Sequence, residues 1–71
     1  MSTIKDLREA KGWSQTKLAQ RAMLSHPIVN KSERGKPISE KSFLLICNAL
    51  GVKPEKVSGV VLTTGKRQDK D

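Results

Sequence analysis

Apolar residues in the first third of the chain recur every three or four positions, which is typical of short amphipathic helices. The first such pattern predicts a helix from about Thr3 to Lys11, and Gly12 after it suits a left-handed helix end. Ser14 can cap a second helix over residues 15–22, because its side-chain oxygen can accept from the unpaired backbone N–H groups of the first turn. The expected inward-facing residues of these two helices are Ile4, Leu7, Ala10, Leu18, Ala19 and Ala22.

A third helix is expected to run to about Arg34, where Gly35 ends it. Pro27 falls in its first turn, a position where a missing backbone N–H removes no hydrogen bond. Because proline disfavours helical geometry in the residue before it, the cap of this helix is either Ser25 or His26.

Two further helices are expected in the second half of the chain. Ser39 can cap a fourth helix over residues 40–50, and Gly51 stops it. Pro54 suits the first position of a fifth helix, which Gly59 and a run of β-branched residues make short or weak. The apolar residues of this last helix are Val57, Val60, Val61 and Leu62.

These elements predict an all-α fold of five helices. The fold forms one domain over residues 1–62, and a disordered polar tail follows over residues 63–71. The second and third helices are short, capped and joined by a brief connection, as in a helix-turn-helix. In that motif the second helix enters the major groove of B-DNA while the first helix braces it.

The charge of the chain supports a nucleic-acid partner. Fourteen Lys and Arg against seven Asp and Glu give a net charge of +7, and residues 14–37 alone carry +4 of it. Such a surface is expected to bind nucleic acid, an acidic protein or an anionic membrane. Trp13 and Phe43 are the only aromatic residues, which disfavours single-stranded nucleic acid, because its binders stack bases on aromatic side chains.

The sequence gives no reason to expect an enzyme, a metal or a cofactor. Cys47 is the only cysteine and His26 the only histidine, so neither a Cys–His metal site nor a Ser–His–Asp set can be assembled convincingly. No stretch approaches the ~18 apolar residues of a membrane span, and the N-terminus has no apolar core of a signal peptide. We therefore expect a cytoplasmic protein with no membrane partner.

Five motifs occur in order along the chain: Leu7-Arg8-Glu9-Ala10-Lys11-Gly12, Ser14-Gln15-x-x-Leu18-Ala19, Ser25, Glu33-Arg34-Gly35-Lys36 and Ala49-Leu50-Gly51-Val52. In this order and spacing they closely resemble the phage repressor and Cro family of helix-turn-helix regulators, over about residues 4–57. The resemblance implies a bundle of five helices. It also implies phosphate contacts from Gln15 and Lys36, and base reading by Ser25, His26, Pro27, Asn30 and Lys31.

The chemistry of several side chains fits these roles. Asn30 can make paired hydrogen bonds to adenine, and Lys31 can donate to guanine or to phosphate. Gln15 and Lys17 lie at a helix N-terminus, which is a natural seat for phosphate. Arg34 could serve either DNA binding or the fold, and a structural role, paired with glutamates of the bundle, is favoured.

The chain departs from the family pattern at three positions. Met23 stands where the family usually has a glycine, and a left-handed backbone there would cost on the order of 1 kcal/mol. Ser32 replaces a large apolar residue on the inner side of the third helix. Glu40 replaces a common core leucine, and Ile38 can fill part of that space.

The leading functional hypothesis is a sequence-specific transcriptional regulator, a repressor of bacterial or phage type. A two-fold homodimer is expected through the C-terminal part, where Leu45, Val60, Val61 and Leu62 leave apolar surface. The alternative is a protein-interaction module on the same fold, either an antitoxin that masks a toxin or an adaptor that bridges regulators. Binding to random duplex DNA at low salt separates the two hypotheses, because a pure adaptor should show little.

Overall fold

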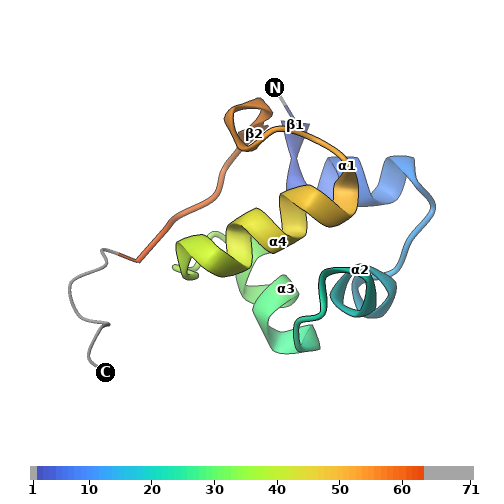
Figure 1. Cartoon of the computed structure of the whole chain (residues 1–71), viewed down its shortest axis with the longest axis horizontal. Helices are drawn as coiled ribbons and strands as arrows, with labels where there is room; N and C mark the ends of the chain where they lie inside the picture. Colours follow the sequence, from blue (N-terminus) through green and yellow to red (C-terminus); the bar gives the residue numbers. More distant parts are fainter. Residues whose placement is uncertain (1, 64–71) are drawn as a thin grey trace.

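The computed structural model describes residues 2–63, and this part of the chain is mostly helical. Its elements are β1 (Ser2–Thr3), α1 (Ile4–Ala10), α2 (Gln15–Ala22), α3 (His26–Glu33), α4 (Glu40–Leu50), η1 (Pro54–Lys56) and β2 (Val57–Ser58). Figure 1 shows α4 across the middle of the molecule, with α2 and α3 below it and the β1–β2 pair above. Apart from Thr63, the tail predicted over residues 63–71 lies outside the described residues.

The helices begin where the sequence places hydroxyl caps. Ser14 accepts from the backbone N–H of Lys17, and Ser39 caps α4 in the same way. Thr3 and Asp6 form a reciprocal capping box at the start of α1. Ser25 occupies the cap position of α3, but its side chain makes no capping hydrogen bond. Its hydroxyl is therefore available for another partner.

One core joins all four helices. Ile4 from α1, Leu18 from α2, Val29 from α3 and Ile46 from α4 are each at most 1% exposed. Full burial of an aliphatic side chain of this kind contributes roughly 1.5–3 kcal/mol. The packing of α2 against both α3 and α4 therefore fixes the direction in which α3 points.

The loop between α3 and α4 also contributes to the core. Ile38 is 3% exposed, whereas Glu40 is exposed, so the aliphatic residue lies inside and the carboxylate remains in solvent. The backbone N–H of Ile38 donates to the carbonyl of Val61 at 3.0 Å, and its carbonyl accepts from Thr63 at 2.9 Å. These bonds hold the C-terminal segment beside this loop.

The predicted fifth helix is wrong, although the four α-helices and a small strand pair still fit an all-α domain. Only the 3₁₀ turn η1 forms after Pro54, and Val57 and Ser58 then pair as β2 with β1 in parallel. β-Branched residues favour extended backbone, and Gly59 adopts a positive φ of 77°, which no helix can continue. The segment therefore ties the two ends of the domain together instead of adding a helix.

The turn between α2 and α3 contains one residue with a left-handed backbone, Met23, at the position where the family that the sequence resembles usually has a glycine. Met23 has φ 58° and ψ 41°, and no other non-glycine residue in the described part of the chain has a positive φ. Its side chain is 82% exposed, so little packing offsets the strain. This departure from the family pattern therefore lowers stability.

We expect Met23→Gly to stabilise the domain. Relief of the left-handed strain, about 1–2 kcal/mol, exceeds the extra chain entropy of glycine, about 0.5–1 kcal/mol. A net gain near 1 kcal/mol should raise Tm by about 4–8 °C for a domain of this size. Thermal unfolding followed by circular dichroism measures it. The matched control Gln20→Gly, at an exposed helical position, should lower Tm, and an equal fall in both variants would contradict the prediction.

Candidate nucleic-acid interface

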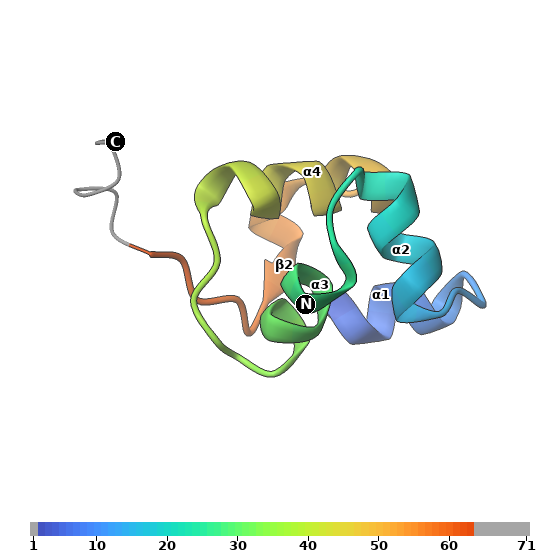
Figure 2. The ribbon, with the colours of Figure 1, turned by 90° about the horizontal axis from the view of Figure 1, so that it is seen from below.

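Helix α3 lies at the surface with one face open to solvent. Figure 2 views the molecule from the side of α3, and no other helix lies in front of it. Among the five residues predicted to read bases, Ser25, His26, Pro27 and Lys31 are exposed and Asn30 is half-buried. The structure thus places all five at the start or along the outer part of one helix.

The opposite face of α3 is anchored in the core. Val29 is fully buried, and Ser32 is 3% exposed although a hydroxyl there replaces the usual large apolar residue. The Ser32 hydroxyl donates to the carbonyl of Val29 at 2.7 Å, so its burial leaves no donor unpaired. The small side chain is therefore accommodated without loss of the helix.

Cationic side chains surround the exposed face of α3. Lys31, Arg34 and Lys36 are exposed and Lys17 is half-buried, at the start of α2. The backbone N–H of Lys36 donates to the carbonyl of Lys31 at 2.9 Å, which holds the loop after α3 close to the helix. Three of these cations therefore come from α3 and the turn after it, and the fourth from the helix that braces it.

The single carboxylate of residues 14–37 is turned away from this face. Glu33 forms a two-pronged ion pair with Arg8 of α1, with Nε–Oε2 at 2.6 Å and Nη2–Oε1 at 3.1 Å. The two side chains are 5% and 11% exposed, respectively. Arg8 also donates through Nη1 to the carbonyl of Trp13 at 2.7 Å. The pair thus fastens the end of α3 to α1 and to the turn that precedes α2.

The protonation of Glu33 follows from this environment. Burial alone would raise the pKa of its carboxyl, but hydrogen bonds from Arg8 and Gln15, with the nearby charges of Arg8 and Lys5, outweigh burial and lower it. The hydrogen bond to Glu33 likewise raises the pKa of Arg8, against a smaller opposing effect of burial. Both groups are therefore charged at neutral pH.

Two amide side chains extend from the ion pair to the exposed face. The Nε2 of Gln15 donates to Oε1 of Glu33 at 3.0 Å, and the Nδ2 of Asn30 donates to Oε1 of Gln15 at 3.3 Å. Gln15 is the first residue of α2 and Asn30 lies one turn before Glu33 on α3. We call Arg8, Glu33, Gln15 and Asn30 the amide relay.

Sequence reasoning missed the first member of this relay. It assigned the internal ion pair to Arg34, but Arg34 is exposed and Arg8 is the arginine that pairs with Glu33. A signal was present, since Arg8 lies one helical turn after the buried Ile4 and so shares its inward face. A charged residue at such a position needs a buried partner.

Trp13 contributes to the packing of the bundle. It is half-buried and packs against the core. Lys11 and Arg21 approach its ring, with Nζ at 5.2 Å and Cζ at 5.7 Å from the ring centroid. The indole is thus held by cation–π contacts within the domain.

Neither a metal site nor a membrane span is found in residues 2–63. No three His, Cys, Asp or Glu side chains there lie close enough together to hold a metal ion. None of the helices in this range has the length and apolar content that crossing a bilayer requires.

Comparison with known proteins adds one finding. A family model described as helix-turn-helix matches residues 4–57, which span the four α-helices and the turn η1. No curated protein and no solved structure matches the chain.

Proposed function

Since this chain belongs to the helix-turn-helix family of Cro/repressor type, we propose that it is a sequence-specific transcriptional repressor that reads the major groove of double-stranded DNA with α3. One observation carries the proposal: the outer face of α3 combines exposed polar side chains with a cationic border and has no acidic group. A helix of this kind fits the major groove, and the cations match the phosphates on either side.

The side chains divide into two roles by position. The N-terminal and outer residues of α3 read base edges, because this part of a recognition helix enters the groove first. Those residues are Ser25, His26, Pro27, Asn30 and Lys31. Gln15 and Lys17 at the start of α2, and Lys36 after α3, contact phosphates and set the register.

Selection of binding sites from a random duplex pool tests the function. We expect a defined motif, with a preference at one base pair that Asn30→Ala removes, at a cost of roughly 1–3 kcal/mol in discrimination. Lys36→Ala should instead weaken binding to all sequences alike, since a phosphate contact carries no base information. Recovery of sequences without any common motif would overturn the proposal.

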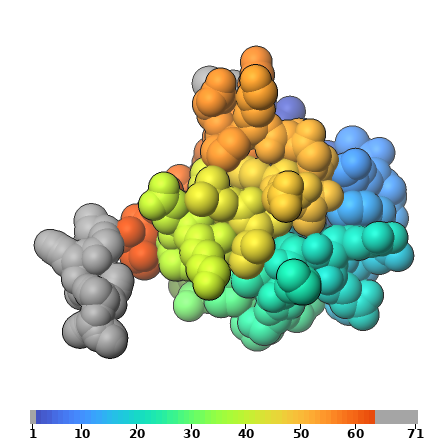
Figure 3. All heavy atoms as spheres, in the orientation of Figure 1, coloured from blue at the N-terminus to red at the C-terminus, as the bar shows by residue number. Residues whose placement is uncertain are grey.

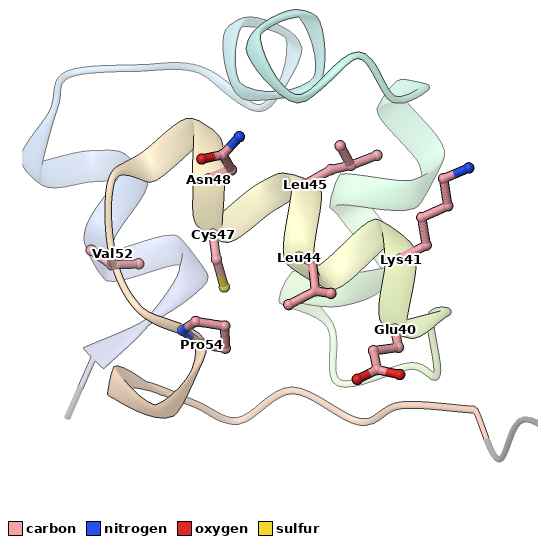
Figure 4. Close-up of a pocket in the computed structure, with 8 residues that line it drawn as sticks. All are labelled: Glu40, Lys41, Leu44, Leu45, Cys47, Asn48, Val52 and Pro54. Carbon is pink, nitrogen blue, oxygen red and sulfur yellow. The ribbon is translucent and has the colours of Figure 1, made fainter.

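A two-fold homodimer accounts for an apolar face on the side of α4. Leu44 is 46% exposed, Val61 45% and Leu62 40%, although all three are large apolar residues. A hollow of about 560 Å³ lies beside Leu44 and is also lined by Leu45 and other residues of α4 and the turn after it. Figure 3 presents the α4 side of the molecule, and Figure 4 shows the residues that line the hollow.

The proposed occupant of this hollow is a second copy of the chain. Figure 4 shows Glu40 and Leu44 pointing from α4 toward the segment after η1, with Lys41 along the other edge of the helix. A two-fold axis brings identical patches together, so Glu40 of one copy can face Lys41 of the other across an apolar centre. Sedimentation should show a dimer, and Leu44→Glu a monomer. A wild-type monomer at high concentration, with and without DNA, would contradict the dimer.

The protein-interaction alternative gives a different result in a simple assay. An antitoxin or adaptor that does not bind DNA would show little affinity for random duplex at low salt, whereas a repressor binds it through its phosphate contacts. The inward pairing of Glu33 favours the repressor, because it removes the one negative charge from the cationic face.

A further inference from the structure

The amide relay has a fixed direction, which follows from its carboxylate. An ionised carboxylate has no proton to donate, so the side chain of Gln15 must turn its NH₂ group toward Glu33. Its carbonyl oxygen Oε1 then faces Asn30, which must in turn present its own NH₂ group to Gln15. The orientation of the last amide is thus decided by the charge on Glu33, two side chains away.

This direction determines what Asn30 can offer to a ligand. One N–H of its NH₂ group is directed at Gln15, so the acceptor Oδ1 and the second N–H are left without a hydrogen-bond partner in residues 2–63. With the amide held in this direction, Oδ1 can accept from the exocyclic amino groups, N6 of adenine or N4 of cytosine, and the second N–H can also donate to N7 of adenine. Oδ1 is repelled by the carbonyl oxygens of guanine and thymine, and turning the amide over to meet them would break the bond to Gln15.

We propose that Glu33 is a positioning residue for DNA reading, and that the amide relay makes Asn30 select a base bearing an amino group in the major groove. The inference rests on the proposed function and adds a specificity rule to it. Arg8 belongs to the same device, because its paired bonds to both oxygens of Glu33 hold the carboxylate in place. The ion pair that joins α1 to α3 therefore affects base recognition as well as the stability of the fold.

The first experiment cuts the relay at its middle. Gln15→Met keeps the length of the side chain and leaves Arg8 and Glu33 paired, but Asn30 loses its acceptor and its amide can turn over. At the base pair where Asn30→Ala removes the preference, the wild type should favour adenine or cytosine over guanine or thymine by roughly fivefold or more. In Gln15→Met this ratio should approach one.

A matched control separates positioning from phosphate binding. Lys17 lies in the same first turn of α2 as Gln15 but takes no part in the relay. Lys17→Met should therefore weaken binding to all sequences alike and keep the wild-type base ratio. A Gln15→Met variant that also keeps the ratio would overturn the inference.

A second variant tests the direction of the relay. In Glu33→Gln, the amide oxygen can keep the place of Oε2 beside Nε of Arg8. The NH₂ group then takes the place of Oε1, where it loses the bond from Nη2 of Arg8 and faces Gln15, which reverses both following amides. The preference should then move toward guanine or thymine, provided that circular dichroism shows the native helical signal. An unchanged adenine or cytosine preference in this folded variant would contradict the proposal.

An assay without DNA keeps the two proposals distinguishable. In the free wild-type protein, the Asn30 side-chain NH₂ protons should exchange with solvent more slowly than those of the exposed Asn48, and Gln15→Met should remove the difference. If the wild type selects no motif, the proposed function fails. If it selects a motif but Gln15→Met changes neither the ratio nor the exchange, only the relay fails.

Discussion

Arg8→Ala is expected to unfold most of the population at 25 °C. Removal of one partner from a buried ion pair costs about 3–5 kcal/mol, because the other charge stays buried and unpaired. A single core of this size supplies only about 3–5 kcal/mol in total. The variant also leaves the carbonyl of Trp13 without its donor. Urea titration followed by circular dichroism measures the free energy of unfolding.

Arg34→Ala is the matched control, since Arg34 is exposed and its side chain makes no hydrogen bond or ion pair within residues 2–63. The stability of this variant should stay within about 0.5 kcal/mol of the wild type.

The change of stability in acid provides a second check, because protonation of Glu33 should act in opposite directions in the wild type and in Arg8→Ala. The lowered pKa of Glu33 makes its contribution to wild-type stability full above the ordinary glutamate pKa and lost as pH falls below it. In Arg8→Ala the unpaired buried carboxyl is relieved by protonation, so the gap between the two proteins should narrow in acid. Equal stability of Arg8→Ala and wild type at pH 7 would refute the assignment.

Raising the salt concentration from 50 to 200 mM is expected to weaken DNA binding by about 10³–10⁵-fold. The cations at the α3 face are Lys17, Lys31, Arg34 and Lys36, and two copies together present enough of them to neutralise about 6–10 phosphates. Each neutralised phosphate releases counterions, which makes log affinity fall linearly with log salt. Fluorescence anisotropy of a labelled duplex across this salt range gives the slope.

The position of a lysine should decide whether it affects the slope. Lys36→Ala should reduce the slope by about one for each copy bound, because one phosphate contact is lost. Lys56→Ala removes the same charge from η1, which lies on the far side of the molecule from α3 (Figure 1). This control should leave the slope unchanged. Equal reductions by both variants would show that net charge, and not the α3 face, governs binding.

Local signals in the sequence were sufficient for most of the helices. The bounds predicted for α2 and α4 agree with the structure, and α3 ends within one residue of the predicted end. A hydroxyl cap and a helix-ending glycine act within a few residues, so they can be identified in a single sequence. The cost of a left-handed backbone at Met23 was considered only because the resemblance to the family places a glycine there, and the structure has that backbone.

Features that depend on distant residues were not predicted. The pairing of β1 with β2 joins residues from opposite ends of the domain, and a strand of two residues has no periodicity to detect. The relay depends on Arg8 and Glu33, which are 25 positions apart. The candidate base-reading residues could be named from the motif, but the direction in which Asn30 is held required the structure.

The burial of Cys47 allows local opening of the domain to be measured by the reactivity of this one thiol. Cys47, the only cysteine of the chain, is 2% exposed, and burial raises the pKa of its thiol. Although Cys47 lines the hollow beside Leu44, so little of it is exposed that a thiol reagent should react appreciably only when the packing around α4 opens. The rate of alkylation in the absence of denaturant thus counts these excursions without any added label, and bound DNA or a second subunit that holds the helices closed will slow it.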